Sequence, residues 1–81
     1  MHYFYILRCK DKTLYCGNTN NLANRETLHN TGKGSIYVHA HGGGKIIYNE
    51  AYAMKGDAMR REIEVKKWPR ANKLRLIKIG K

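Results

Sequence analysis

Two apolar segments near the start of the chain predict a pair of β-strands. Residues 3–9 are apolar or aromatic at both odd and even positions as far as Leu7, a pattern typical of a strand that is covered on both faces and central in its sheet. A polar break over residues 10–12 separates this strand from a second predicted strand at residues 13–17. We therefore expect the two strands to form a hairpin.

The length of the hairpin loop decides whether Tyr5 and Tyr15 lie on the same face of the sheet. A two-residue loop would place the tyrosines on opposite faces, because a shift of one residue turns every side chain over. A three-residue loop over residues 10–12 would pair Leu7 with Tyr15 and make the tyrosines diagonal neighbours, roughly 7–8 Å apart at the backbone. Both registers stay open, since a three-residue loop favours a left-handed residue near its end and Lys12 is not the usual choice there.

The middle of the chain predicts one helix followed by a glycine-rich loop. Residues 18–20 offer several N-caps for a helix that runs to about Asn30 and stops at Gly32. Residues 32–44 contain five glycines, so we expect a mobile loop with at most a short ordered turn near residues 36–38.

The last part of the chain predicts a strand and two helices. Residues 45–52 form the third strand, and Asp57 is expected to cap a helix over residues 58–67. Pro69 ends that helix and can occupy the first turn of another, over residues 70–78. The apolar side chains expected to face the core from these helices are Met59, Ile63, Leu74 and Ile77.

The resulting order, ββαβαα, predicts an α+β fold with a three-stranded antiparallel sheet flanked by helices. The length of 81 residues allows one domain, residues 1–81. The longest apolar run, residues 3–7, is too short to span a membrane, and we see no secretion signal. Two cysteines make no disulfide framework, so we expect a soluble, cytoplasmic protein with reduced thiols.

Positive charge is concentrated towards the end of the chain. The formal net charge is +10, with six bases against three acids in residues 1–54 and ten bases against three acids in residues 55–81. Such a basic third is typical of proteins with a polyanionic partner, because phosphate neutralisation dominates the affinity for nucleic acid. We expect salt-sensitive nucleic-acid binding, driven mainly by residues 55–81.

Five side chains carry candidate chemistry: Tyr5, Tyr15, Arg25, His29 and Glu62. Arg25 and His29 share a helix face with Leu22. A tyrosine beside cations can accept a proton, an arginine fork suits a phosphate, and a lone carboxylate can bind one hard metal ion. These are the groups that phosphodiester hydrolysis requires.

Three of these groups also have a structural interpretation. Tyr5 and Tyr15 could simply pack within the sheet. Glu62 could pair with Lys66, four residues later, on a solvated helix face.

The ordered motifs resemble the GIY-YIG nuclease superfamily over essentially the whole chain. The resemblance rests on Phe-Tyr-Ile at residues 4–6, Tyr-Cys-Gly at residues 15–17, and then Arg25, His29 and Glu62. The opening, the segment at residues 30–34 and the run at residues 60–62 before Lys66 are most similar to the small, stand-alone branch of that superfamily.

The resemblance implies a DNA endonuclease that depends on one divalent ion, Mg²⁺ or Mn²⁺. By position, Tyr5 matches the general base, Tyr15 a residue lining the same pocket, and Gly17 a point of close approach. Arg25 then matches the phosphate-contacting arginine. His29 matches a histidine that supports the tyrosine or the phosphate, and Glu62 the metal-binding glutamate.

Several alternatives follow from this resemblance and the charge. The protein could be a DNA endonuclease in repair or processing, or a non-catalytic module that binds nucleic acid through the same basic groove. A partner protein or a dimer could supply substrate specificity. The side chains expected to contact nucleic acid are Arg8, Lys33, Arg60, Arg61, Lys66, Arg70 and Asn72.

Overall fold

The computed structural model describes residues 1–80 and confirms the predicted α+β fold. In chain order its elements are β1 (His2–Cys9), β2 (Leu14–Thr19), α1 (Leu22–Asn30), α2 (Ile36–Ala40), β3 (Gly44–Tyr52), α3 (Lys55–Lys66) and α4 (Arg70–Ile79). The short helix α2 lies where a mobile loop was predicted. It forms because the Ser35 side chain accepts a hydrogen bond from the backbone N–H of Val38 and so caps the first turn.

The three strands form one antiparallel sheet in the order β2-β1-β3. The central position of β1 agrees with its apolar character on both faces. In the hairpin, Tyr5 lies opposite Gly17 and Leu7 lies opposite Tyr15, which is the register of the three-residue loop. Lys12 adopts the left-handed conformation that this loop requires, with a φ of 73°, at a cost of roughly 1–2 kcal/mol.

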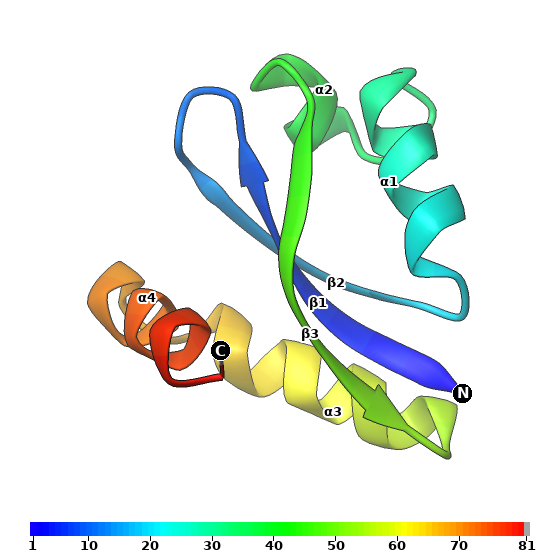
Figure 1. The fold of residues 1–81 in the computed structure, drawn as a ribbon, viewed down its shortest axis with the longest axis vertical. Helices are drawn as coiled ribbons and strands as arrows, with labels where there is room; N and C mark the ends of the chain where they lie inside the picture. The colour runs from blue at the N-terminus through cyan, green and yellow to red at the C-terminus, as the bar shows by residue number, and fades with distance from the viewer. Residues whose placement is uncertain (81) are drawn as a thin grey trace.

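The two faces of the sheet carry separate cores. On one face Phe4 and Ile6 pack with Val65 of α3, and side chains of α4 extend this cluster. On the other face Tyr5 and Leu7 pack with Val38 of α2. Figure 1 shows α1 and α2 on one side of the sheet and α3 and α4 on the other.

The beginnings of two helices differ from the prediction. The N-cap of α1 is Asn21, whose side chain accepts from the N–H of Asn24, because β2 continues through Thr19. Helix α3 begins at Lys55 without a side-chain cap, so the prediction that Asp57 caps it is wrong. Asp57 lies in the first turn, where a carboxylate interacts favourably with the helix dipole.

The buried face of α3 is also different from the one predicted. Met59 and Ile63 are 43% and 56% exposed, whereas Ala58 and Val65 are buried. Positions 58 and 65 are seven residues apart and therefore share a face, while each next position is about 100° further around the helix. The larger apolar side chains thus point away from the core.

Of the two α4 side chains predicted to face the core, one does and one does not. Ile77 packs against the core as predicted, together with Leu76. Leu74 is 44% exposed, so its predicted inward position is wrong.

Both cysteines, Cys9 and Cys16, are buried free thiols. Among residues 1–80 no helix has the length and apolar character needed to cross a membrane.

Candidate active site

A buried hydrogen bond between Tyr5 and His29 forms the centre of the site. The Tyr5 hydroxyl oxygen lies 2.7 Å from Nε2 of His29, and the two residues are only 2% and 1% exposed. Tyr5 comes from the central strand β1, and His29 comes from the last turn of α1, which packs over this face of the sheet.

Two glycines make room for this pair. A Cβ atom at Gly17, opposite Tyr5 on β2, would lie 2.5 Å from the Tyr5 hydroxyl oxygen. A Cβ atom at Gly34 would lie 2.6 Å from Nδ1 of His29 and 2.9 Å from its backbone nitrogen. The role of Gly17 in close approach was expected. Gly34 was missed, and its only sequence signal is its place in the motif-like segment at residues 30–34.

Aromatic rings surround the Tyr5–His29 pair. The Tyr15 ring lies 6.4 Å from the Tyr5 ring and 5.4 Å from the His29 ring, both between centroids. On its other side it stacks on Tyr37 of α2 at 5.8 Å. Tyr15 and Tyr5 therefore share a face, and the cluster extends to a partly exposed tyrosine that sequence reasoning missed.

Arg25 brings a cation to the same site. It lies one turn before His29 on α1, and its Nε atom is buried without a hydrogen-bond partner among residues 1–80. A buried donor left without a partner is costly. This donor is therefore a candidate contact for an anionic group such as phosphate.

Glu62 reaches the site from the opposite layer of the fold. Its Oε1 accepts a hydrogen bond of 2.5 Å from Nδ2 of Asn18 on β2, and its Oε2 accepts one of 2.7 Å from Nζ of Lys66. The same Nζ lies 5.9 Å from the centroid of the Tyr15 ring. Glu62 is thus connected to the Tyr15 side of the site through Lys66, and the structure contains the predicted pair between Glu62 and Lys66.

The protonation states at the centre follow from burial and neighbouring charges. Burial, followed by the neighbouring Tyr15, raises the pKa of Tyr5 well above its usual value, although Arg25 opposes the shift. Burial, followed by the charge of Arg25, lowers the pKa of His29. At neutral pH a neutral phenol therefore faces a neutral imidazole.

A metal ion at Glu62 would have few protein ligands. Within residues 1–80 no group of three or more His, Cys, Asp or Glu side chains could hold a metal ion. Mg²⁺, however, commonly binds through one or two carboxylates together with water and substrate phosphate. The lone carboxylate fits that mode, provided that Lys66 releases it.

The residues predicted to contact nucleic acid fall into different settings. Arg61 belongs to a set of side chains that we call the Glu50 cluster: Tyr48, Glu50, Tyr52, Arg61 and Glu64. Its guanidinium also lies 5.1 Å from the Trp68 ring, so Arg61 has structural partners rather than a free surface. Arg60 pairs with Asp57, and Lys66 pairs with Glu62. Arg8, Lys33, Arg70 and Asn72 are exposed.

Comparison with known proteins identifies the family. The family model of the GIY-YIG catalytic domain matches residues 1–75. A UPF0213 protein of Oceanobacillus iheyensis is 46% identical over 76 residues, which cover 94% of this chain and 88% of that protein. A UPF0213 protein of Clostridium perfringens is 47% identical over 77 residues, which cover 95% of this chain and 83% of that protein.

A solved structure shows the same fold. The solution NMR structure of a UPF0213 protein from Bacillus halodurans is similar with a TM-score of 0.62 and 39% sequence identity, and the match covers 98% of this chain and 85% of that one. Taken with the match over residues 1–75, this similarity establishes that the chain belongs to the GIY-YIG family.

Proposed function

We propose that this protein is a small, metal-dependent DNA endonuclease that hydrolyses phosphodiester bonds, with a role in DNA repair or processing. GIY-YIG is a nuclease family, and the names of the UPF0213 relatives specify no activity. The observation that carries the proposal is that the Tyr5–His29 hydrogen bond lies one helical turn from Arg25, whose buried Nε atom has no partner among residues 1–80. A proton acceptor and a phosphate contact are thereby held at one place.

Tyr5 acts as the general base with the help of His29. Because its pKa is raised, Tyr5 is protonated at rest and cannot act as a preformed phenolate. It can take a proton from water only as its own proton passes to Nε2 of His29, 2.7 Å away. The hydroxide then attacks phosphorus, and the bond to the leaving oxygen breaks. A neutral His29, which its lowered pKa favours, is required for this transfer.

Arg25 and Glu62 act on charge rather than on protons. The Arg25 guanidinium donates to the phosphoryl oxygens as negative charge develops on them in the transition state. Glu62 would hold one Mg²⁺ or Mn²⁺ ion, which when bound supplies Lewis-acid stabilisation of the reacting phosphate. Lys66, which pairs with Glu62 in this structure and lies beside the Tyr15 ring, would have to release the carboxylate for the ion to bind.

A cleavage assay on labelled DNA tests the proposal. The substrates are single-stranded, duplex, nicked and branched DNA, each with Mg²⁺, with Mn²⁺ and with EDTA. We expect metal-dependent cleavage that is lost in Glu62→Gln and kept in Glu64→Gln, which removes a carboxylate from the exposed side of the same helix. Wild-type cleavage by the Glu62→Gln variant would refute the role of Glu62.

The binding-module alternative also has an observation in its favour. Both carboxylate oxygens of Glu62 already have protein partners, Asn18 and Lys66, as in a structural ion pair. A non-catalytic module would bind DNA tightly and cleave none of the substrates with either ion. That result would replace the proposed enzyme with the module.

A further inference from the structure

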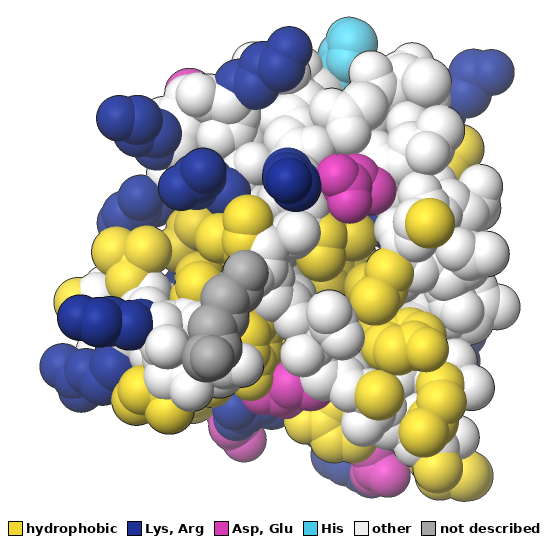
Figure 2. Space-filling view, in the orientation of Figure 1, with side chains coloured by type: hydrophobic (Ala, Val, Ile, Leu, Met, Phe, Trp, Pro, Cys, Tyr) yellow, Lys and Arg dark blue, Asp and Glu magenta, His cyan; other side chains and the backbone are white. Residues whose placement is uncertain are grey.

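A second concentration of positive charge lies at the hairpin end of the sheet, away from the basic final third of the chain. A cavity of about 380 Å³ is lined there by Arg8, Lys10, Lys12 and Lys45, together with Cys9, Asn30 and Gly44. Figure 2 shows Lys and Arg side chains gathered over the hairpin end and the start of β3, at the upper left of the view. We call this cavity the hairpin pocket.

The four cations of the hairpin pocket lack acidic partners. Among residues 1–80 none of them forms an ion pair, and no acidic side chain lines the cavity. The nearby loop residue Asp11 is engaged elsewhere, because it accepts hydrogen bonds from Thr13 and pairs with His41. The positive charge of the pocket is therefore available to an anion from outside.

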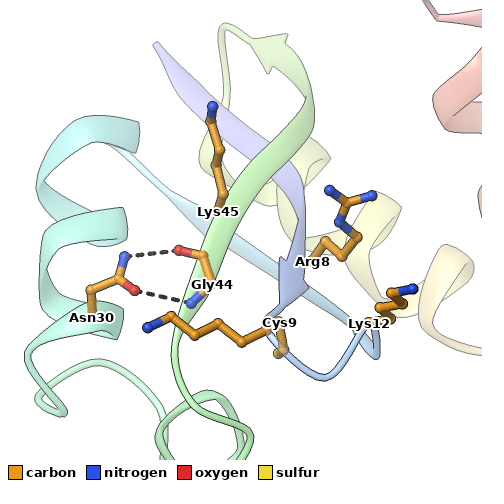
Figure 3. Close-up of a pocket in the computed structure, with 7 residues that line it drawn as sticks. Arg8, Cys9, Lys12, Asn30, Gly44 and Lys45 are labelled. Carbon is orange, nitrogen blue, oxygen red and sulfur yellow. Dashed lines mark hydrogen bonds between the residues drawn. The ribbon is translucent and has the colours of Figure 1, made fainter.

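The backbone around the hairpin pocket is tightly packed. Asn30 donates from Nδ2 to the carbonyl of Gly44 at 2.8 Å and accepts from its N–H at 3.0 Å, as Figure 3 shows. A Cβ atom at Gly44 would lie 2.4 Å from the carbonyl oxygen of Arg8. Gly42 and Gly43 have φ values of 88° and 78°, which favour glycine. The glycines at residues 42–44 thus allow the start of β3 to lie close to β1 and to Asn30, which line the pocket.

The same arrangement works against stability. Arg8 and Lys45 are direct partners across β1 and β3, and like charges directly opposite each other destabilise a sheet. Lys12 has a positive φ where glycine or asparagine would be less strained. Repulsion and strain held at one place are typical of a site kept for binding rather than for folding.

We propose that the hairpin pocket binds a backbone phosphate of the nucleic-acid substrate, outside the phosphate that reacts; this inference rests on the proposed function. Arg8 directly follows Leu7, the partner of Tyr15, and Lys45 lies one strand further across the sheet. Two lining residues connect the pocket to the candidate active site, because Cys9 packs in one cluster with Tyr5 and Leu7, and Asn30 directly follows His29 at the end of α1.

The chemistry of the pocket fits binding and not a reaction. Cys9 is the only thiol among the residues that line it, and burial raises the pKa of this thiol. A protonated, buried thiol is a poor nucleophile. Flexible lysines with one arginine suit a phosphate that must be held and then released.

The test compares two double variants that remove the same charge. Lys10→Gln with Lys45→Gln alters the hairpin pocket, whereas Lys55→Gln with Lys78→Gln alters exposed lysines of α3 and α4. Fluorescence anisotropy with a labelled 20-nucleotide DNA in EDTA measures affinity between about 50 and 200 mM salt. We expect the pocket variant to lose about 10-fold in affinity and its log–log salt slope to fall by about 1–2, with less than about 3-fold loss in the control.

Two results would overturn the proposal. Equal losses of affinity in the two double variants would mean that the pocket contributes no more to binding than the lysines of the basic final third of the chain. Inorganic phosphate that shifts the Gly44 and Lys45 amide resonances, with an oligonucleotide affinity unchanged in the pocket variant, would mean that the pocket serves a small free anion.

Two controls keep the proposal separate from folding and from the proposed function. The melting temperature of the pocket variant should stay equal or rise, because repulsion between Arg8 and Lys45 is removed. Since affinity is measured in EDTA, a wild-type protein that never cleaves DNA would refute the proposed nuclease while the affinity comparison still decides the role of the pocket.

Discussion

The fold contains two partly buried polar clusters that differ in how completely their hydrogen bonds are satisfied. In the Glu50 cluster, the carboxylate of Glu50 accepts from Tyr48 at 2.5 Å, from Tyr52 at 2.7 Å and from Arg61 at 2.9 Å. In the candidate active site, Nε of Arg25 and Nδ1 of His29 are buried and have no partner among residues 1–80. The complete cluster joins α3 to β3, whereas the incomplete one leaves buried polar atoms without a protein partner.

The cost of each arrangement explains this difference. A polar group buried without a partner destabilises a protein by about 1–3 kcal/mol, so a fold keeps such groups where another selective pressure acts. The clusters should therefore respond oppositely to mutation: changes in the Glu50 cluster reduce stability, and changes at Arg25 reduce activity.

Replacing Arg25 should give the largest effect. We expect Arg25→Ala to reduce the cleavage rate about 10²–10³-fold, since the guanidinium acts on charge that develops in the transition state. DNA affinity in EDTA should fall only slightly, because one cation is lost. Single-turnover cleavage and anisotropy on the same DNA measure both quantities.

Arg75→Ala is the matched control for this experiment, because Arg75 is an exposed arginine of α4. It should leave the cleavage rate unchanged. An Arg25→Ala variant that cleaves at the wild-type rate would show that the unpartnered Nε atom has no catalytic use.

Replacing Glu50 should affect stability instead. We expect Glu50→Ala to reduce the free energy of unfolding by about 1–3 kcal/mol, because Tyr48, Tyr52 and Arg61 lose their shared acceptor. Thermal unfolding measures the change, and about 1 kcal/mol corresponds to about 4–8 °C in a domain of this size. Glu64→Ala, at the exposed edge of the cluster, should cost less than about 1 kcal/mol. Similar losses in the two variants would contradict a buried, cooperative cluster.

Adding a methyl group at Gly17 should affect both stability and activity. We expect Gly17→Ala to destabilise the fold by about 1–3 kcal/mol, because its Cβ atom would lie 2.5 Å from the Tyr5 hydroxyl oxygen. The displaced hydroxyl would also leave His29, so cleavage should fall.

Gly56→Ala provides the opposite control. Gly56 lies within α3, where the nearest atom to an added Cβ is 3.9 Å away on Arg60. It should stabilise the protein by about 0.5–1 kcal/mol. A Gly17→Ala variant as stable and as active as the wild type would mean that the close approach of Tyr5 is not needed.

The sequence was most informative where a short-range pattern determines geometry. The apolar residues at both parities of residues 3–9 identified the central strand, and helical spacing placed Arg25 and His29 on one face. The shared face of Tyr5 and Tyr15 depended on the loop length, which the sequence could not decide because Lys12 is unusual at a left-handed position.

The sequence was less informative where tertiary contacts override local preference. Met59 and Ile63 were expected in the core. The inward face of α3 instead includes Arg61 and Glu62, which bond to polar side chains of β3 and β2. The stacking of Tyr37 on Tyr15 depends on α2, a helix within a segment whose glycines suggested a loop. Contacts between residues distant in the chain leave no local periodicity to detect.

The two clusters should also lose their contributions to stability at different pH values. Burial and the charge of Arg25 lower the pKa of His29, so the unfolded chain takes up its proton more readily than the native protein. The contribution of His29 to stability is therefore full above about pH 6.5 and decreases as the pH falls below that value. Although burial opposes it, hydrogen bonding from Arg61 and the two tyrosines lowers the pKa of Glu50, so the contribution of Glu50 to stability is lost only below about pH 4.5, the usual pKa of a glutamate.

The smallest expected effect is consequently a loss of stability between about pH 6.5 and 5 that belongs to the active site alone. Thermal unfolding of the wild type and of His29→Gln from pH 8 to 5 measures it. The variant should be less stable at pH 8, because the bond to Tyr5 is lost, and the difference between the two proteins should narrow on acidification. The other three histidines are present in both proteins, so the difference between the proteins reports on His29. Wild-type cleavage should decline only at lower pH, where His29 of the native protein is itself protonated and can no longer accept the proton of Tyr5. A constant stability difference would show that His29 takes up its proton equally in the native and unfolded states, and would contradict the lowered pKa on which the proposed proton transfer relies.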